Sequence, residues 1–196
     1  SAERVRDEWF RSLETATDLA RLVALWGAVG AAARWLPGLA ADYPLAERAP
    51  PARDPVLLTA ALCRDSGGAL DRLRASGAEI ARAARIDRAP AAPAGTDPVA
   101  VRRWLARVEP GADDLTAVAR LRTGAEAAWA PVMAGIRARG EATNRGALAV
   151  TGQDLQAAGV PPGPEIGRLL GELLEQVLED PARNDRTVLL AWVASR

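Results

Sequence analysis

Apolar residues recur along most of the chain at the three- and four-residue spacing of an amphipathic α-helix. Near the N-terminus, Val5, Trp9 and Leu13 fall on one helical face. The longest stripe lies between residues 164 and 180 and contains Ile166, Leu169, Leu170, Leu173, Leu174, Val177 and Leu178. Strand patterns are nearly absent, because aromatic residues make up only 4% of the chain and runs of β-branched residues are few. The pattern predicts an all-α fold of many helices.

Capping residues and prolines predict where individual helices begin and end. Pro164 is expected to start the helix with the longest stripe, and Pro181 to end it. Three other starts are marked by a capping residue, in two cases followed by proline: Asp54 with Pro55, Thr96 or Asp97 with Pro98, and Asn184 or Asp185. The run from 68 to 86 is expected to carry the helical pattern on, with three residues facing inward: Leu70, Leu73 and Ile80.

The charge of the chain is balanced, with 25 basic and 25 acidic residues in 196, and every basic residue is an arginine. Balanced charge excludes a protein that binds nucleic acid through bulk electrostatics, so any RNA site must be a local patch. No window holds the roughly 20 apolar residues of a membrane span, and the N-terminus lacks the apolar core of a signal peptide. The single cysteine, Cys63, fits a reducing compartment. We therefore expect a soluble, cytoplasmic protein without a membrane partner.

Several kinds of catalytic chemistry are excluded by residues that the chain lacks. It has no histidine, which excludes Ser-His-Asp and Cys-His catalysis and histidine-based zinc sites, and one cysteine cannot build a cysteine-rich zinc site. The adjacent Asp113 and Asp114 would point about 100° apart on a helix, so they cannot converge on one metal ion. We interpret them as charges or a cap at the start of a helix. The sequence predicts no catalytic residue and no metal ligand in this chain.

One stretch, "DLQAAGVPPGPEIGRLLGELLEQVL" at 154–178, has an unusual amount of turn before a regular helix. A short helix, a turn bounded by Gly159 and Gly163, and a second helix from Pro164 form the layout of a helix-hairpin-helix element. Glycine reaches backbone conformations that other residues avoid, and proline loses no useful donor in the first helical turn. The turn therefore directs the N-terminus of the second helix outward.

This helix N-terminus is a candidate phosphate site. The N–H groups of Glu165, Ile166 and Gly167 are expected to point outward, with the positive end of the helix dipole behind them. Gly167 has no side chain, so a phosphate can come close, and Arg168 can add a charge-assisted bond. With Gly163, these residues are the predicted RNA-phosphate contacts. Glu165 opposes the idea, because its carboxylate repels phosphate unless it turns away. The alternative is a glycine-capped helix followed by a proline-started helix with no ligand.

Three further arginines, Arg137, Arg139 and Arg145, precede this element and are candidates for a neighbouring basic patch. Arginine offers a planar fork of donors that suits phosphate oxygens. The alternative interpretation is a solvated loop in which these side chains have no ligand.

The chain resembles the bacterial tRNA nucleotidyltransferase (CCA-adding enzyme) and poly(A) polymerase family along essentially its whole length, most strongly toward the C-terminus. "SAERVRDEW" resembles the family's neck helix, with Ser1, Glu3, Arg4 and Glu8 at the matching places. "VTGQDLQAAGVPPGPEIGRLLGELLEQVLED" and the closing "NDRTVLLAWV" resemble its tail. The resemblance divides the chain into the remainder of a neck domain at 1–40, a helical body at 41–145 and a helical tail at 146–196.

The resemblance implies a protein that holds tRNA through its acceptor stem and elbow. The family's catalytic head, which uses Mg²⁺ and takes ATP or CTP, has no counterpart in this sequence, so no cofactor is expected here. We expect the tRNA-binding C-terminal part of a class II CCA-adding tRNA nucleotidyltransferase, which would need a catalytic head in the same or another chain. The alternatives are the equivalent part of a poly(A) polymerase, or a free-standing helical adaptor for RNA or protein.

Overall fold

The computed structural model describes residues 1–40 and 53–195. Across these residues it holds twelve α-helices and two short 3₁₀ turns, with no strand apart from an isolated bridge between Leu39 and Cys63. The predicted all-α fold is confirmed. No helix among them is long and apolar enough to cross a membrane. The chain forms two compact units, a first unit of residues 1–90 and 110–127 and a second unit of residues 91–109 and 128–196.

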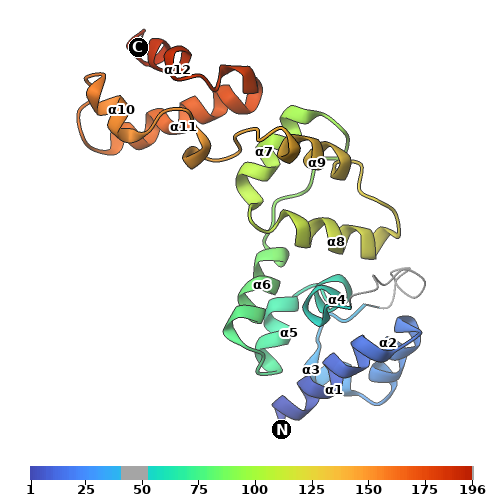
Figure 1. Ribbon diagram of the computed structural model, residues 1–196. Coiled ribbons are helices and arrows are strands. Elements are labelled where there is room, and N and C mark those ends of the chain that lie inside the picture. Colours follow the sequence, from blue (N-terminus) through green and yellow to red (C-terminus); the bar gives the residue numbers. More distant parts are fainter. Residues whose placement is uncertain (41–52, 196) are drawn as a thin grey trace. The chain divides into compact units, whose positions relative to one another are not determined.

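The first unit contains seven helices (Figure 1). They are α1 (Ala2–Thr15), α2 (Leu19–Ala28), α3 (Ala31–Trp35), α4 (Pro55–Leu62), α5 (Ser66–Arg72), α6 (Gly77–Asp87) and α8 (Ala112–Thr123). Its core is centred on Trp9, whose ring meets that of Trp26 edge-on with 4.8 Å between centroids. The buried indole N–H of Trp9 donates to Thr59 Oγ1 at 3.0 Å, which satisfies a polar group that burial would otherwise leave unpaired.

The second unit contains five α-helices and both 3₁₀ turns. They are α7 (Pro98–Val108), α9 (Ala130–Ala138), η1 (Arg145–Ala147), α10 (Gly152–Ala157), α11 (Pro164–Glu179), η2 (Pro181–Arg183) and α12 (Arg186–Ala194). The predicted stripe of α11 faces the core: Leu169, Leu173, Val177 and Leu178 are buried, and the other three members are half-buried. Leu155 of α10 and Leu189 of α12 pack into the same cluster.

The predicted helix starts at 54, 97 and 185 are confirmed. Asp54, Asp97 and Asp185 are the N-caps, and each side chain accepts two backbone N–H bonds from the first helical turn. The structure thus selects Asp97 over Thr96 and Asp185 over Asn184. Asp114 lies in the first turn of α8, where its carboxylate binds the guanidinium of Arg82 at 2.7 Å. The interpretation of Asp113 and Asp114 as charges at the start of a helix is confirmed.

A buried arginine joins helices within the second unit. Arg102 of α7 donates to the carbonyl oxygens of Leu178 at 2.7 Å and Glu179 at 3.1 Å, which are acceptors left open at the end of α11. Its charge is balanced by Glu141 at 2.9 Å, and both side chains are no more than 10% exposed. Burial alone would raise the pKa of Glu141, but hydrogen bonds from Arg139 and Arg102 outweigh it and lower that pKa.

The run from 68 to 86 is not one helical segment. It belongs to α5 and α6, which are separated by a turn at Arg74, and α6 begins with a capping box between Ser76 and Glu79. Leu70 and Leu73 are buried as expected, whereas Ile80 is half-buried.

Three helix ends are closed by the same pair of backbone hydrogen bonds, the Schellman arrangement. A residue in the left-handed conformation donates to the carbonyl three residues back, and the next residue donates five back, at 2.9 to 3.1 Å. At the ends of α9 and α10 the left-handed residue is glycine, Gly140 with φ 63° and Gly159 with φ 94°. At the end of α5 it is Arg74, with φ 57°. Arg74 is the only non-glycine residue with positive φ among the described residues.

Candidate functional site

The predicted helix–turn–helix layout is present in the second unit, where α10 and α11 are joined by residues 158–163. Gly159 and Gly163 have φ of 94° and 143°, a region that side chains disfavour. A Cβ added at either glycine would meet no atom within 4 Å, so the requirement is for backbone conformation and not for space. Glycine therefore sets the path of the turn that presents the first residues of α11.

The first turn of α11 leaves one of the three expected donors without an acceptor. No acceptor among the described residues takes the N–H of Glu165, whereas Gly167 lies a full turn beyond the N-cap Gly163, where the N–H belongs to the helix's own hydrogen bonding. The N–H of Ile166 donates to the carbonyl of Gly163 at 3.2 Å, so Ile166 differs from the expectation. A Cβ added at Gly167 would also meet nothing within 4 Å, which leaves this side of the helix open.

A cavity of about 360 Å³ lies beside this turn. Its walls come from the end of α10, the turn, the first two turns of α11 and the end of α12: Ala158, Gly159, Val160, Pro161, Glu165, Arg168, Leu169, Val193 and Ala194. Apolar side chains form most of this lining, and Glu165 and Arg168 supply its charges.

Arg168 is held by two carboxylates. Its guanidinium pairs with Glu165, with Nε 3.0 Å from Oε2, and also with Glu172. These contacts raise the pKa of Arg168 above its ordinary value, chiefly through Glu165, and Arg168 lowers the pKa of Glu165. Three charges thus leave a net negative trio, and a phosphate would have to displace a carboxylate to reach Arg168. The sequence predicted that the carboxylate of Glu165 would repel a phosphate. In the structure this carboxylate also occupies the guanidinium of Arg168.

The three preceding arginines do not form one patch. Arg137 pairs with Glu109 at 2.7 Å and Arg139 with Glu141 at 2.6 Å. Arg145 is exposed and has no ion pair among the described residues. Its Nη2 would lie 3.0 Å from a Cβ placed on Gly171, so the guanidinium rests on the surface of α11.

Gly171 extends an open strip along α11. Gly163, Gly167 and Gly171 follow at intervals of four residues, which places them one above the other on one side of the helix. We call this strip, with Arg145 lying on its third glycine, the glycine face of α11. It has the unused N–H of Glu165 near one end and, at the other, Arg145, which has no ion pair among the described residues.

The four neck residues belong to the first unit. Ser1 is the N-cap of α1 without a side-chain cap, and its carbonyl accepts the N–H of Val5 at 3.2 Å. Glu3 lies in the first helical turn, where a backbone hydrogen bond and then the Ser1 side chain lower its pKa. Arg4 and Glu8 are exposed on the same helix. Their assignment to the neck helix of the family stays a prediction.

Within the described residues, no group of three or more cysteine, aspartate or glutamate side chains can hold a metal ion. Cys63 is buried, and burial raises the pKa of its thiol to about 12.

Residues 141–193 match the family described as "tRNA nucleotidyltransferase domain 2, putative". The resemblance is thereby confirmed for the C-terminal helices. The matched segment contains α10, α11 and nearly all of α12, and with them the turn, the glycine face and all of the cavity lining except Ala194. A CCA-adding enzyme of Levilactobacillus brevis is 51% identical over 47 residues, which is 24% of this chain and 12% of that enzyme. No solved structure is similar.

The sequence did not predict that Arg145, alone among Arg137, Arg139 and Arg145, lies on α11. It also did not predict that Glu172 pairs with Arg168. Glu172 could have been found, because residues four apart on a helix are neighbours. The contact of Arg145 with Gly171 had no such signal, since it joins residues from separate elements.

Proposed function

We propose that the C-terminal helices of this chain bind the phosphate backbone of tRNA, as part of a CCA-adding tRNA nucleotidyltransferase. The observation that carries the proposal is the match of residues 141–193 to domain 2 of that family, because those residues build the turn and the glycine face. The proposed partner is tRNA, with contacts to acceptor stem and elbow. Mg²⁺, nucleotide and the transfer step are assigned to a catalytic head in the same or another polypeptide.

The glycine face is proposed to hold the phosphates. The free N–H of Glu165 stands at the positive end of the helix dipole, which favours a bound anion, and Gly167 leaves the adjacent surface without a side chain. Arg145 adds a cation that forms no ion pair with a carboxylate among the described residues, whereas Arg168 is paired with Glu165. Such contacts recognise phosphate positions and not bases, which suits a protein that must accept many tRNA sequences.

The test is binding of the 196-residue chain to a tRNA lacking its CCA end, compared with single-stranded RNA of equal length at two salt concentrations. Non-specific binding would give dissociation constants of roughly 10⁻⁴–10⁻⁶ M with little preference. We expect tighter, salt-sensitive binding that prefers tRNA. Arg145→Ala should weaken it and reduce the salt slope by about 1. Gly167→Glu should weaken it further, because a carboxylate would stand on the open face.

The matched control is Arg120→Ala, which removes an exposed arginine of α8 in the first unit. Arg168→Ala is a poorer probe of phosphate contact, because it would leave Glu165 and Glu172 unpaired and repel RNA for that reason alone. If Arg145→Ala and Gly167→Glu both bind tRNA as tightly as the Arg120→Ala control, the proposed phosphate site is wrong.

A further inference from the structure

A second cavity, of about 350 Å³, lies in the first unit and is lined by arginines. Its walls come from the end of α3 and the end of α5: Arg34, Trp35, Asp71, Arg72 and Arg74. Three arginines and one aspartate therefore line a space at the small end of the range for ligand pockets. None of these residues belongs to the segment that matches a known family.

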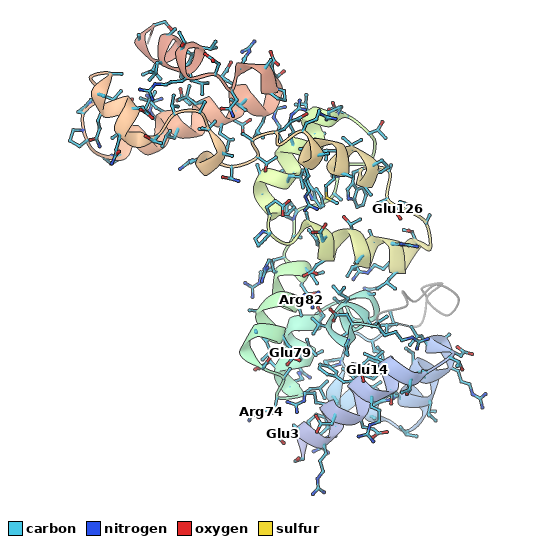
Figure 2. All side chains as sticks on the ribbon, in the orientation of Figure 1. Glu3, Glu14, Arg74, Glu79, Arg82 and Glu126 are labelled. Atoms are coloured by element: carbon cyan, nitrogen blue, oxygen red, sulfur yellow. The ribbon has the colours of Figure 1, made fainter. Side chains whose placement is uncertain are left out.

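The three arginines are not neutralised by neighbours. Arg34, Arg72 and Arg74 are exposed, and no carboxylate of the described residues forms an ion pair with any of them. Glu3 approaches Arg74 in Figure 2, but the charge of Arg74 is the smallest influence on the pKa of Glu3. Elsewhere in this unit an arginine at a helix junction is satisfied, since Arg82 binds both Asp54 and Asp114. The cavity therefore keeps cationic donors free for a ligand.

The side chain of Arg34 and the backbone of Arg74 are held in position. The guanidinium carbon of Arg34 lies 5.3 Å from the ring centroid of Trp35, a cation–π contact that restricts the long side chain. The backbone of Arg74 is fixed by the Schellman hydrogen bonds, and its carbonyl accepts a further bond from Arg6 Nη1 at 3.0 Å. A fixed arginine loses less conformational entropy when it binds.

Arg74 occupies a position where glycine is preferred. The equivalent residues of α9 and α10 are Gly140 and Gly159, and the conformation is strained for any side chain. Strained backbone conformations of this kind cluster at active sites and ligand-binding positions. The side chain that is kept here is a guanidinium on the wall of a cavity.

We propose that Arg34, Arg72 and Arg74 bind a phosphate group of a nucleotide, carried either in an RNA strand or as a free nucleotide. Guanidinium forks match phosphate oxygens in pairs, and three of them exceed the single charge of Asp71. This site is independent of the glycine face, because its residues lie in the other unit.

The test uses Arg74→Gly, which removes the guanidinium and relieves the strained backbone. The matched control is Arg88→Gly, which removes an exposed arginine at the end of α6, outside the cavity lining. Thermal unfolding should show Arg74→Gly to be at least as stable as the parent chain, so a loss of binding would not reflect a loss of fold. Binding is measured with single-stranded RNA and with ATP, each at two salt concentrations.

We expect Arg74→Gly to weaken binding about tenfold, and for RNA to lower the salt slope by about 0.7, while Arg88→Gly has little effect. Loss of ATP binding would assign the site to free nucleotides, and loss of RNA binding alone would assign it to an RNA strand. Equal effects of Arg74→Gly and Arg88→Gly on both ligands would overturn the proposal. So would displacement of RNA by polyglutamate at equal charge concentration, since the site would then read only negative charge. Arg145→Ala reports on the glycine face, so the two proposals fail separately.

Discussion

The two cavities, one in each unit, have nearly the same volume, about 350 and about 360 Å³, but differ in what surrounds their arginines. In the second unit Arg168 is enclosed by Glu165 and Glu172. In the first unit Arg34, Arg72 and Arg74 have no carboxylate partner among the described residues. The site that the sequence motif indicated thus has a compensated cation, and the site that no motif indicated has free ones. A motif predicts backbone geometry more reliably than it predicts available charge.

The helix ends beside these cavities make the same contrast. α10 closes with Gly159 and α5 closes with Arg74, through equivalent hydrogen bonds. The left-handed conformation costs a residue with a side chain about 1–2 kcal/mol, a cost that glycine avoids. Glycine therefore makes this turn more stable in the second unit. In the first unit the turn has a charged side chain, at a cost in conformational free energy.

The largest difference between the units should come from the buried pair of Arg102 and Glu141, in which Arg102 binds the C-terminal end of α11. Glu141→Ala leaves Arg102 buried without its counter-charge, which typically costs 3–5 kcal/mol, so we expect about that loss in the free energy of unfolding. The cavity of the first unit rests on no equivalent pair among its lining residues. Denaturant unfolding followed by circular dichroism measures the effect.

The control for Glu141→Ala is Glu175→Ala, because Glu175 also pairs with an arginine of α7 but is 60% exposed. Exposed pairs contribute about 0–1 kcal/mol. A loss for Glu141→Ala no greater than that for Glu175→Ala would contradict the structural role assigned to the buried pair.

Helix starts were the part of the fold that the sequence predicted best. Asp54, Asp97 and Asp185 act through bonds to their own next residues, so their signal is local. The pattern of α11 is equally local, because seven apolar residues at helical spacing can face only one way. The division near residues 40 and 145 stays a prediction. The assignment of the consecutive helices α7 and α8 to different units follows from long-range packing, which periodicity does not encode.

The candidate sites depended on contacts that sequence spacing does not reveal. The end of α5 was overlooked because Arg74 replaces the glycine that marks such turns. The pairing of Arg137 with Glu109 joins residues 28 apart, so its loss from the predicted basic patch could not be foreseen. In contrast, the pairing of Arg168 with Glu165 and Glu172 follows from helical spacing of three and four.

A smaller effect should appear as a pH dependence of the second unit. Asp154 forms a capping box with Thr151 at the start of α10, and its carboxylate also pairs with Arg186 of α12. Hydrogen bonds, the strongest of them from Arg186, lower the pKa of Asp154 to about 2. A carboxylate whose pKa is lower in the folded state stabilises the fold at any pH above its ordinary pKa of 3.8. That contribution is lost as the pH falls through the folded-state pKa of about 2. We expect Asp154→Asn to be less stable than the parent at pH 5, with the gap closing toward pH 2.

Arg186→Gln provides the matched comparison for Asp154→Asn, because it removes the other partner of the same contact. Both variants should show a flatter decline of unfolding temperature between pH 4 and pH 2 than the parent chain. Parallel declines in all three proteins would show that Asp154 does not link stability to pH. The cavity of the first unit has no ion pair of this kind, so the test concerns the second unit.

The smallest effect on stability is expected from replacing glycines within the helices of the two units. Gly167 of α11 faces open space, so Gly167→Ala should stabilise the second unit by about 1 kcal/mol through helix propensity alone. Gly67 of α5 is different, because an added Cβ would lie 2.9 Å from the Cβ of Ala84. Gly67→Ala should therefore destabilise the first unit by about 1–3 kcal/mol through overpacking. Thermal unfolding of both variants checks the opposite signs.

The value of Gly167→Ala lies in measuring stability and tRNA affinity on the same variant. If a phosphate approaches the backbone of α11 closely, one methyl group on the glycine face should weaken tRNA binding although the protein becomes more stable. If Gly167 has no role in binding, Gly167→Ala should raise the stability and leave the affinity for tRNA unchanged. Opposite changes in stability and affinity would thus place the glycine at the contact, since no loss of fold can account for them.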